Sequence, residues 1–199
     1  MSKLSWLIVL WLAFFGCKGQ PASSQAVAQA AGTPRVVLET NHGEIEIELL
    51  PAKAPLGVKN FLRYLESGAY NGTIFHRVVR GFVIQGGGFE PNLQRRPTLE
   101  PLQNEADNGL GNERGTVAWA RTPDPHSATN QFYVNLKANP GLDHHEKTQE
   151  GWGYAVFGKV VRGLEVADRI SELPVGPQGP FPTAPKDPVV IQRARLVGK

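Results

Sequence analysis

Glycine and proline interrupt this chain so often that its regular elements must be short. The sequence contains 22 glycines and 16 prolines among 199 residues, and both residue types favour turns over long helices. Between the interruptions, apolar and polar residues alternate with the period of a β-strand. Val36–Leu50 shows this clearly, because it alternates on both sides of Asn41-His42-Gly43. This pattern predicts two antiparallel strands joined by a tight turn in which Gly43 supplies a positive φ.

Two segments have helical periodicity instead. The first begins at Pro55 and ends at Gly68, and apolar residues recur between them at i, i+3, i+4 and i+7. The second covers Leu164 to Leu173, with its apolar residues on one side, and stops at Pro174. This spacing is typical of amphipathic helices that cover a core with one face.

The remaining pattern predicts a mainly β protein. Further short strands are expected at Thr73–Val79, Phe82–Gln85, Thr116–Ala120, Gln131–Leu136, Tyr154–Val161 and Val189–Val197. Two intervening segments, Glu90–Arg114 and Lys137–Gly153, are expected to be loops. Strands and helices do not alternate, which argues against a parallel nucleotide-binding sheet. We expect a closed or nearly closed antiparallel barrel capped by two helices.

The first residues have the form of an export signal. Lys3 precedes an apolar run, Leu4–Phe15, which is shorter than the ~20 residues that span a bilayer and is typical of a secretory signal. The sequence is compatible with two alternative processing sites. Gly16-Cys17 resembles a bacterial lipoprotein site, and Cys17 is the only cysteine of the chain. The alternative is Ala28-Gln29-Ala30, which fits the A-x-A pattern of ordinary cleavage.

We therefore expect three regions. Residues 1–16 form a signal peptide, residues 17–34 form a flexible tether that is lipidated at Cys17, and residues 35–199 form the folded domain. The tether is rich in Gln, Ala, Ser and Gly, so it cannot bury a core. The acyl chains of a lipoprotein anchor would hold the domain stably at a membrane, in the periplasm.

One predicted strand has an unusual second face. The apolar face of Gln131–Leu136, which is typical of a core, holds Phe132, Val134 and Leu136. The mixed face holds Gln131, Tyr133 and Asn135. In the strand Phe82–Gln85, Val83 and Gln85 likewise share a face. Two interpretations remain open: the mixed face is a half-hydrated barrel exterior, or it is a shallow peptide-binding groove.

Several common chemistries lack their residues. No G-x-S-x-G nucleophile motif occurs, and Gly86-Gly87-Gly88 lacks the Lys and Ser/Thr of a P-loop. Asp143-His144-His145-Glu146 is not spaced to hold a metal, because adjacent loop histidines rarely share one ion. The net charge of +3 is carried by scattered residues, so nucleic-acid binding is not expected. We predict no metal and no cofactor.

Arg77 is the charged residue that best fits a functional role. It lies in a strand between Phe75 and Val79, on a face that is otherwise apolar. It either pairs with a carboxylate or serves as a fixed hydrogen-bond donor on a peptide groove. His76 lies on the opposite face of the same strand, where a packing or hydrogen-bonding role is expected.

Several segments, taken in order, resemble the cyclophilin family. The longest is FHRVVRGFVIQGGGF, from Phe75 to Phe89. It is followed in the family's order by Gly115–Thr122, Asn130–Tyr133, Gly141–His144 and Tyr154–Val160. The similarity covers Arg35 to Lys199. Details that resemble the bacterial periplasmic branch are Asn104–Gly109, Ala120-Arg121-Thr122 and Tyr154.

The resemblance implies an eight-stranded closed antiparallel barrel capped by two α-helices. It also implies a peptidyl-prolyl cis–trans isomerase, or rotamase, that acts without covalent chemistry and assists the folding of exported proteins. Arg77 would be the catalytic residue. The implied substrate-binding residues are Phe82, Val83, Gln85, Ala120, Arg121, Gln131, Tyr133, Leu142 and Tyr154. The implied partners are unfolded or extended polypeptides that contain proline.

Four positions differ from the commonest eukaryotic cyclophilin pattern. Val83 replaces Met, Tyr133 replaces Phe, and Tyr154 stands where His is common. Gly141 stands where an aromatic residue is common. In the family that aromatic residue supports cyclosporin binding, so weak binding of the drug is expected here. The competing functional hypothesis is a chaperone or scaffold that binds proline peptides without essential catalysis.

Overall fold

A computed structural model describes residues 33–197 of the chain. The expected signal peptide, the expected lipidation at Cys17 and most of the tether lie outside the described residues. The described part is mainly β, as the sequence predicts, and its largest element is a nine-stranded antiparallel sheet. The strands of this sheet are β1 (Arg35–Thr40), β2 (Gly43–Leu49), β3 (Thr73–Ile74), β4 (Arg77–Val79), β5 (Val83–Gly86), β6 (Thr116–Trp119), β7 (Phe132–Asn135), β8 (Val156–Arg162) and β11 (Val190–Val197).

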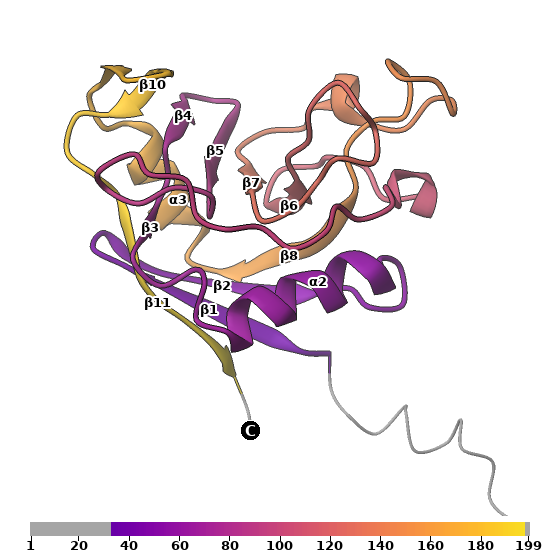
Figure 1. Ribbon diagram of the computed structural model, residues 1–199, viewed down its shortest axis with the longest axis horizontal. Helices are drawn as coiled ribbons and strands as arrows, with labels where there is room; N and C mark the ends of the chain where they lie inside the picture. Colours follow the sequence, from indigo (N-terminus) through magenta and orange to yellow (C-terminus); the bar gives the residue numbers. More distant parts are fainter. Residues whose placement is uncertain (1–32, 198–199) are drawn as a thin grey trace, which may run out of the picture. The chain divides into compact units, whose positions relative to one another are not determined.

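The sheet curls because its two edge strands belong to one segment. Its strand order is β3-β11-β1-β2-β8-β6-β7-β5-β4, and only Phe75 and His76 separate β3 from β4. In Figure 1, β1, β2, β8 and β11 lie below β4, β5, β6 and β7. The expected eight-stranded barrel is therefore approximate. The single strand expected at Thr73–Val79 is divided into two, and these two form the opposite edges of the nine-stranded sheet.

The inner face of the curled sheet holds the main hydrophobic core. Leu38, Ile47, Phe132, Val134 and Phe157 are fully buried in it. The face of β7 that the sequence assigns to the core, with Phe132 and Val134, is confirmed. Because successive side chains of a strand point to opposite faces, the intervening residues of these strands must point outward.

Two α-helices cover different parts of the sheet. Helix α2 (Pro55–Glu66) packs against β8 and β11, and α3 (Leu164–Ser171) packs against β2, β4 and β5. Both helices are predicted correctly, although α3 ends two residues before the expected Leu173. Phe61, which the helical spacing places on the buried face of α2, is fully buried among the rings of Tyr70, Trp119, Phe132 and Phe157.

The two expected loops contain short 3₁₀ helices, η1 (Ala106–Asn108) and η2 (Pro140–Leu142). Sequence reasoning misses a hairpin after α3, formed by β9 (Val175–Gln178) and β10 (Phe181–Pro185). Three prolines fall inside these two strands, and proline within a run argues against a strand. The hairpin packs on β4, so it lies next to Arg77 and His76.

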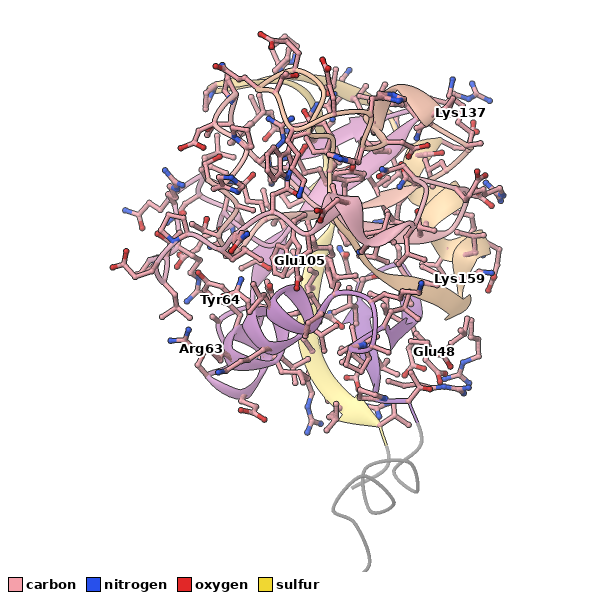
Figure 2. The ribbon with its side chains drawn as sticks, turned by 90° about the vertical axis from the view of Figure 1, so that its right-hand side faces the viewer. Glu48, Arg63, Tyr64, Glu105, Lys137 and Lys159 are labelled. Atoms are coloured by element: carbon pink, nitrogen blue, oxygen red, sulfur yellow. The ribbon has the colours of Figure 1, made fainter. Side chains whose placement is uncertain are left out.

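A residue from the long loop before β6 caps the N-terminus of α2. Ala54 occupies the N-cap position and makes no side-chain cap. The Glu105 carboxylate instead accepts from the N–H groups of Leu56 at 2.9 Å and Gly57 at 2.8 Å. Figure 2 shows Glu105 beside this helix. A Cβ on residue 57 would lie 2.7 Å from Trp119 Nε1, so glycine permits the close approach.

This cap predicts a measurable loss of stability. Replacing Glu105 by Ala leaves two helix N–H groups without their acceptor and removes a negative charge from the helix N-terminus. We expect Glu105→Ala to lower the free energy of unfolding by about 1–2 kcal/mol, measured by chemical denaturation. Glu100→Ala is the matched control, because Glu100 is exposed in the same loop and makes no side-chain hydrogen bond within residues 33–197. Equal stabilities of the two variants would contradict the capping role.

Candidate active site

A pocket of about 260 Å³ lies on the outer face of the sheet and is called here the outer pocket. It is lined by Arg77, Phe82, Val83, Gln85, Ala120, Arg121, Tyr133, Leu142 and Tyr154. These residues come from β4, β5, β7, η2, the turn between β4 and β5, and the segments flanking β6 and β8. The structure therefore brings together nine of the ten site residues that the sequence suggests. The tenth, Gln131, does not line the pocket, but it accepts a hydrogen bond from Gln85, which does.

The register of the strands places these side chains side by side. Arg77 of β4 pairs with Gln85 of β5, Gln85 pairs with Tyr133 of β7, and Tyr133 pairs with Ala118 of β6. Directly paired residues of neighbouring strands point to the same face. These four side chains therefore form a row across the outer face of the sheet, from the cation of Arg77 to the methyl group of Ala118.

The floor of the outer pocket is a second hydrophobic cluster, separate from the main core. Val83, Ala118, Tyr133 and Val156 form it, and each is at least 96 % buried. Partly buried Phe82, Leu110, Ala120, Leu142 and Tyr154 pack around this floor. The half-hydrated exterior considered for this face is therefore wrong at Tyr133 and at Asn135, which is fully buried. Sequence reasoning misses Ala118 and Val156, because isolated small apolar residues in strands carry no distinguishing pattern.

Arg77 stands at the edge of the outer pocket with few partners. Its Nη1 lies 3.4 Å from Gln85 Oε1, and its guanidinium carbon lies 5.8 Å from the centre of the Phe82 ring. Within residues 33–197 no carboxylate forms an ion pair with Arg77, so the carboxylate pair considered from the sequence is not found. Most of its five N–H donors thus remain available to a bound molecule.

Gln131 orients Gln85 from behind. Gln85 Nε2 donates to Gln131 Oε1 at 3.1 Å, which leaves Gln85 Oε1 facing Arg77. A Cβ on residue 88 would lie 2.5 Å from Gln131 Cγ. The last glycine of the Gly86-Gly87-Gly88 run therefore makes room for this side chain, which is a structural role.

Arg121 uses its donors on the protein itself. Its Nε donates to the Gly153 carbonyl at 2.9 Å, and its Nη1 donates to the carbonyls of Thr122 at 3.0 Å and Pro123 at 3.1 Å. Its guanidinium carbon also lies 4.6 Å from the centre of the Tyr154 ring. Arg121 therefore holds two loops together beside the pocket, and its side chain is not a free donor as that of Arg77 is.

The backbone beside Arg121 offers an unpaired edge. The Ala120 N–H donates to the Gln131 carbonyl at 2.9 Å, which continues the pairing beyond β6 and β7. The next two groups, the Ala120 carbonyl and the Arg121 N–H, have no hydrogen-bond partner in the described part of the chain. One donor and one acceptor at the rim can therefore bind an extended peptide backbone.

His76 lies on the other side of β4, outside the pocket. It is 2 % exposed, and its ring lies 4.7 Å from that of Phe89 and 4.8 Å from that of Phe181 in the β9–β10 hairpin. Burial lowers the pKa of His76 from 6.5 to about 4. The packing role expected for His76 therefore fits its surroundings, and the imidazole is neutral at physiological pH.

The pKa of His76 predicts a loss of stability in acid. The unfolded chain binds a proton at this residue below pH 6.5, whereas the folded chain does so only near pH 4. The free energy of unfolding should therefore fall between pH 6.5 and pH 4, by up to about 3 kcal/mol. Denaturation across this range should show a smaller fall for His76→Gln than for the wild type. His145→Gln, at an exposed position, should keep the full fall, and identical slopes in all three proteins would refute the assignment.

The acidic and histidine-rich segment after η2 makes structural contacts. Asp143 Oδ1 accepts from the Asn112 N–H at 2.6 Å, and His144 Nδ1 lies 2.9 Å from the Trp152 carbonyl oxygen. Among residues 33–197 no group of three or more His, Cys, Asp or Glu side chains is arranged to hold a metal. In the same part of the chain no helix is long and apolar enough to cross a membrane.

A larger hollow, of about 590 Å³, lies beside the C-terminal end of α2. It is bounded by residues 63–69 and 96–99, and Arg63 and Tyr64 project from the helix in Figure 2. The Tyr64 hydroxyl accepts a hydrogen bond from the Leu99 N–H at 2.7 Å, and Arg96 forms an ion pair with Glu90 at 3.1 Å. The second buried hydrophobic cluster lies at the outer pocket and not at this hollow.

Comparisons with known proteins identify the family of the chain. The family model for cyclophilin-type peptidyl-prolyl cis-trans isomerases matches residues 35–196. Peptidyl-prolyl cis-trans isomerase A of Dickeya dadantii is 51 % identical over 89 % of this chain and 92 % of its own length. Isomerase B of Escherichia coli is 51 % identical over 79 % of this chain and 96 % of its own.

Solved structures agree as well. The crystal structure of a cyclophilin-type isomerase from Cryptosporidium parvum superposes with a TM-score of 0.67 at 25 % identity, over 83 % of this chain and 98 % of that one. A second structure of that protein was obtained in the presence of the dipeptide Ala-Pro and has a TM-score of 0.66 at 26 % identity. The chain belongs to the cyclophilin family and is a peptidyl-prolyl cis–trans isomerase.

Proposed function

We propose that the outer pocket binds the proline ring of the substrate and that Arg77 is the catalytic residue. The carrying observation is the position of Arg77, whose free guanidinium stands at the edge of a buried apolar floor. Phe82, Val83, Tyr133 and Leu142 enclose the ring, and Tyr154 lies beside it. Such a site combines an apolar surface for proline with a donor for the peptide bond next to it.

The chemistry explains why a donor suffices. Rotation about an X–Pro bond has a barrier of ~18–20 kcal/mol and takes tens to hundreds of seconds unaided. Reaching milliseconds requires about five decades, or roughly 7 kcal/mol. In the planar amide the nitrogen lone pair is delocalised into the carbonyl, and in the twisted transition state the nitrogen recovers it. A donor near the nitrogen therefore binds the transition state more strongly than the ground state.

Arg77 suits this role because a guanidinium is a planar multiple donor that stays charged. Gln85 binds the substrate backbone from one side of the pocket. The Ala120 carbonyl and the Arg121 N–H bind it from the other side, as an added strand would be bound. The partners are proline-containing polypeptides in extended segments, in keeping with the Ala-Pro dipeptide used with the related structure from Cryptosporidium parvum. Recognition of one proline and a short backbone stretch gives broad specificity.

Replacing Arg77 tests its role. Arg77→Ala should lower kcat in a protease-coupled assay on a proline peptide by about 100-fold or more, because a transition-state donor is lost. Arg77→Lys should fall in between, since it keeps the charge without the planar fork. Arg80→Ala is the matched control. Arg80 is close in sequence but its side chain is 75 % exposed, and its one ion pair among residues 33–197 is with Glu172. Near-wild-type turnover in a folded Arg77→Ala protein would refute the assignment.

The same variant separates catalysis from binding. Arg77→Ala leaves the apolar floor intact, so it should still bind proline peptides. If the physiological role were that of a chaperone or scaffold, this variant would support the folding of client proteins as well as the wild type does. We expect it to lose the acceleration of proline-limited refolding.

We further propose that the enzyme works on exported proteins in the periplasm, held to a membrane by lipid on Cys17. The support is the sequence of residues 1–34: a short apolar run after Lys3, then Gly16-Cys17, then a segment too polar to form a core. The domain begins near Arg35, where the family match starts. A tether of residues 17–34 would let the pocket reach clients near the membrane surface.

Mass spectrometry of the full chain expressed in a bacterial host tests this anchor. The expected mature protein begins at Cys17, carries acyl chains and is found in the membrane fraction. Cys17→Ser should move it out of that fraction and leave the isomerase activity unchanged. A native N-terminus at Ala31 without lipid would contradict the proposal and support cleavage after Ala28-Gln29-Ala30.

Weak binding of cyclosporin is also proposed. Gly141 is exposed, and apart from its two chain neighbours no atom of the described residues lies within 4 Å of the position a Cβ would take. No side chain from elsewhere in the described residues therefore occupies the place of the aromatic residue that is common at this position in the family. The rim of the pocket consequently offers less apolar surface to a large ligand.

A further inference from the structure

A chain of buried amide side chains lies directly behind the outer pocket. Asn112, Asn135 and Asn139 are 1, 0 and 6 % exposed. Burying an amide is unfavourable unless its hydrogen-bonding groups are satisfied, so three in contact require an explanation. Two of them, Asn112 and Asn139, belong to segments that the sequence describes only as loops.

Asn112 connects three walls of the pocket. Its Nδ2 donates to the Leu142 carbonyl at 3.1 Å, to the Tyr154 carbonyl at 3.3 Å and to Asp143 Oδ1 at 3.1 Å. Its Oδ1 accepts from the Tyr133 hydroxyl at 2.8 Å. Tyr133, Leu142 and Tyr154 come from β7, η2 and the segment before β8, so a single amide holds parts of three elements together.

The chain of amides continues to a fourth wall. Asn135 Nδ2 donates to Asn112 Oδ1 at 3.2 Å, and Asn139 Nδ2 donates to Asn135 Oδ1 at 2.7 Å. Asn139 Nδ2 also lies 3.3 Å from the Phe82 carbonyl. Phe82, which also lines the pocket, is thereby linked to the same network.

Hydrogen bonds add what the apolar floor lacks. Hydrophobic contact is not directional, so the floor alone does not fix the separation of the walls around a five-membered ring. Burial raises the pKa of the Tyr133 hydroxyl well above its usual value, which keeps it protonated as a donor to Asn112. Tyr133 replaces the Phe that is commonest in the eukaryotic members, and a Phe side chain has no hydroxyl to make this contact.

We propose that Asn112 is a positioning residue of the isomerase, and that its amide, extended by Asn135 and Asn139, sets the shape of the proline pocket. This inference rests on the proposed function of the outer pocket. The ring is held both before and during rotation, so a distorted pocket weakens ground state and transition state alike. Loss of Asn112 should therefore raise KM and change kcat little, the opposite of the loss expected for Arg77.

The first test is Asn112→Ala in the same proline-peptide assay. KM should rise about tenfold, as expected when positioning contacts are lost, with kcat within about twofold of the wild type. Thr40→Ala is the stability control. Thr40 is 7 % exposed and its Oγ1 makes two hydrogen bonds in the β1–β2 turn, outside the pocket lining. A KM for Asn112→Ala equal to that of Thr40→Ala would overturn the proposal.

A second variant separates the two ends of the amide. Asn112→Asp keeps the acceptor for Tyr133 but replaces the donor to Leu142 and Tyr154 by an oxygen close to Asp143. KM should be high at pH 8 and should fall towards the wild-type value at pH 5.5, because protonation restores a donor. A residue that only supported the fold would not give a pH-dependent KM in a folded protein. A KM that does not change with pH would overturn the proposal.

Two further variants cover the remaining outcomes. If the Asn112 variants do not fold, Asn139→Ala cuts the network at its far end. A raised KM supports the proposal and an unchanged KM overturns it. Phe82→Ala tests the pocket itself. If Phe82→Ala leaves KM unchanged, the proposed proline site fails. If Phe82→Ala raises KM but the asparagine variants do not, only the positioning role fails.

Discussion

The alternation of side chains along β5, β6, β7 and β8 is the constraint on which the rest of this structure depends. Ile84, Val117, Phe132 and Phe157 point inward and belong to the main core. Their neighbours in sequence, Val83, Ala118, Tyr133 and Val156, point outward and form the floor of the pocket. A slip of one residue between two of these strands would exchange the two faces. The packing of the core therefore fixes the register that assembles the outer pocket.

The two arginines of the pocket illustrate how a shared residue type divides into different tasks. Arg121 donates to several backbone carbonyls and stacks on Tyr154, so it stabilises the rim. Within residues 33–197 the Arg77 side chain makes one long hydrogen bond, to Gln85. Its charge is balanced by no carboxylate among the described residues, which supports the catalytic role proposed for it. The number of hydrogen bonds that each guanidinium donates within the described residues distinguishes the two arginines, whereas the sequence does not.

Patterns that repeat along the chain were predictable. The spacing of Phe61 and its neighbours identified α2, and the alternation of Phe132 and Val134 identified an inward face. The family motifs located nine of the residues that line the pocket. Features that depend on one contact between distant residues were not predictable. Glu105 caps a helix that begins 50 residues earlier in the chain, and Asn112 bonds to Tyr133, Leu142 and Tyr154. The β9–β10 hairpin was missed because its prolines contradict the usual composition of a strand.

The separation of the two faces also bears on how such an enzyme can change over generations. Alternate positions of the same strand have different structural roles: inward residues pack the core, and outward residues shape the outer pocket. Substitutions can therefore accumulate at one set while the other is retained. Val83 and Tyr133, which differ from the commonest residues of the eukaryotic members, both lie on the outward set. New client preferences can thus arise at these positions without the fold having to be repacked.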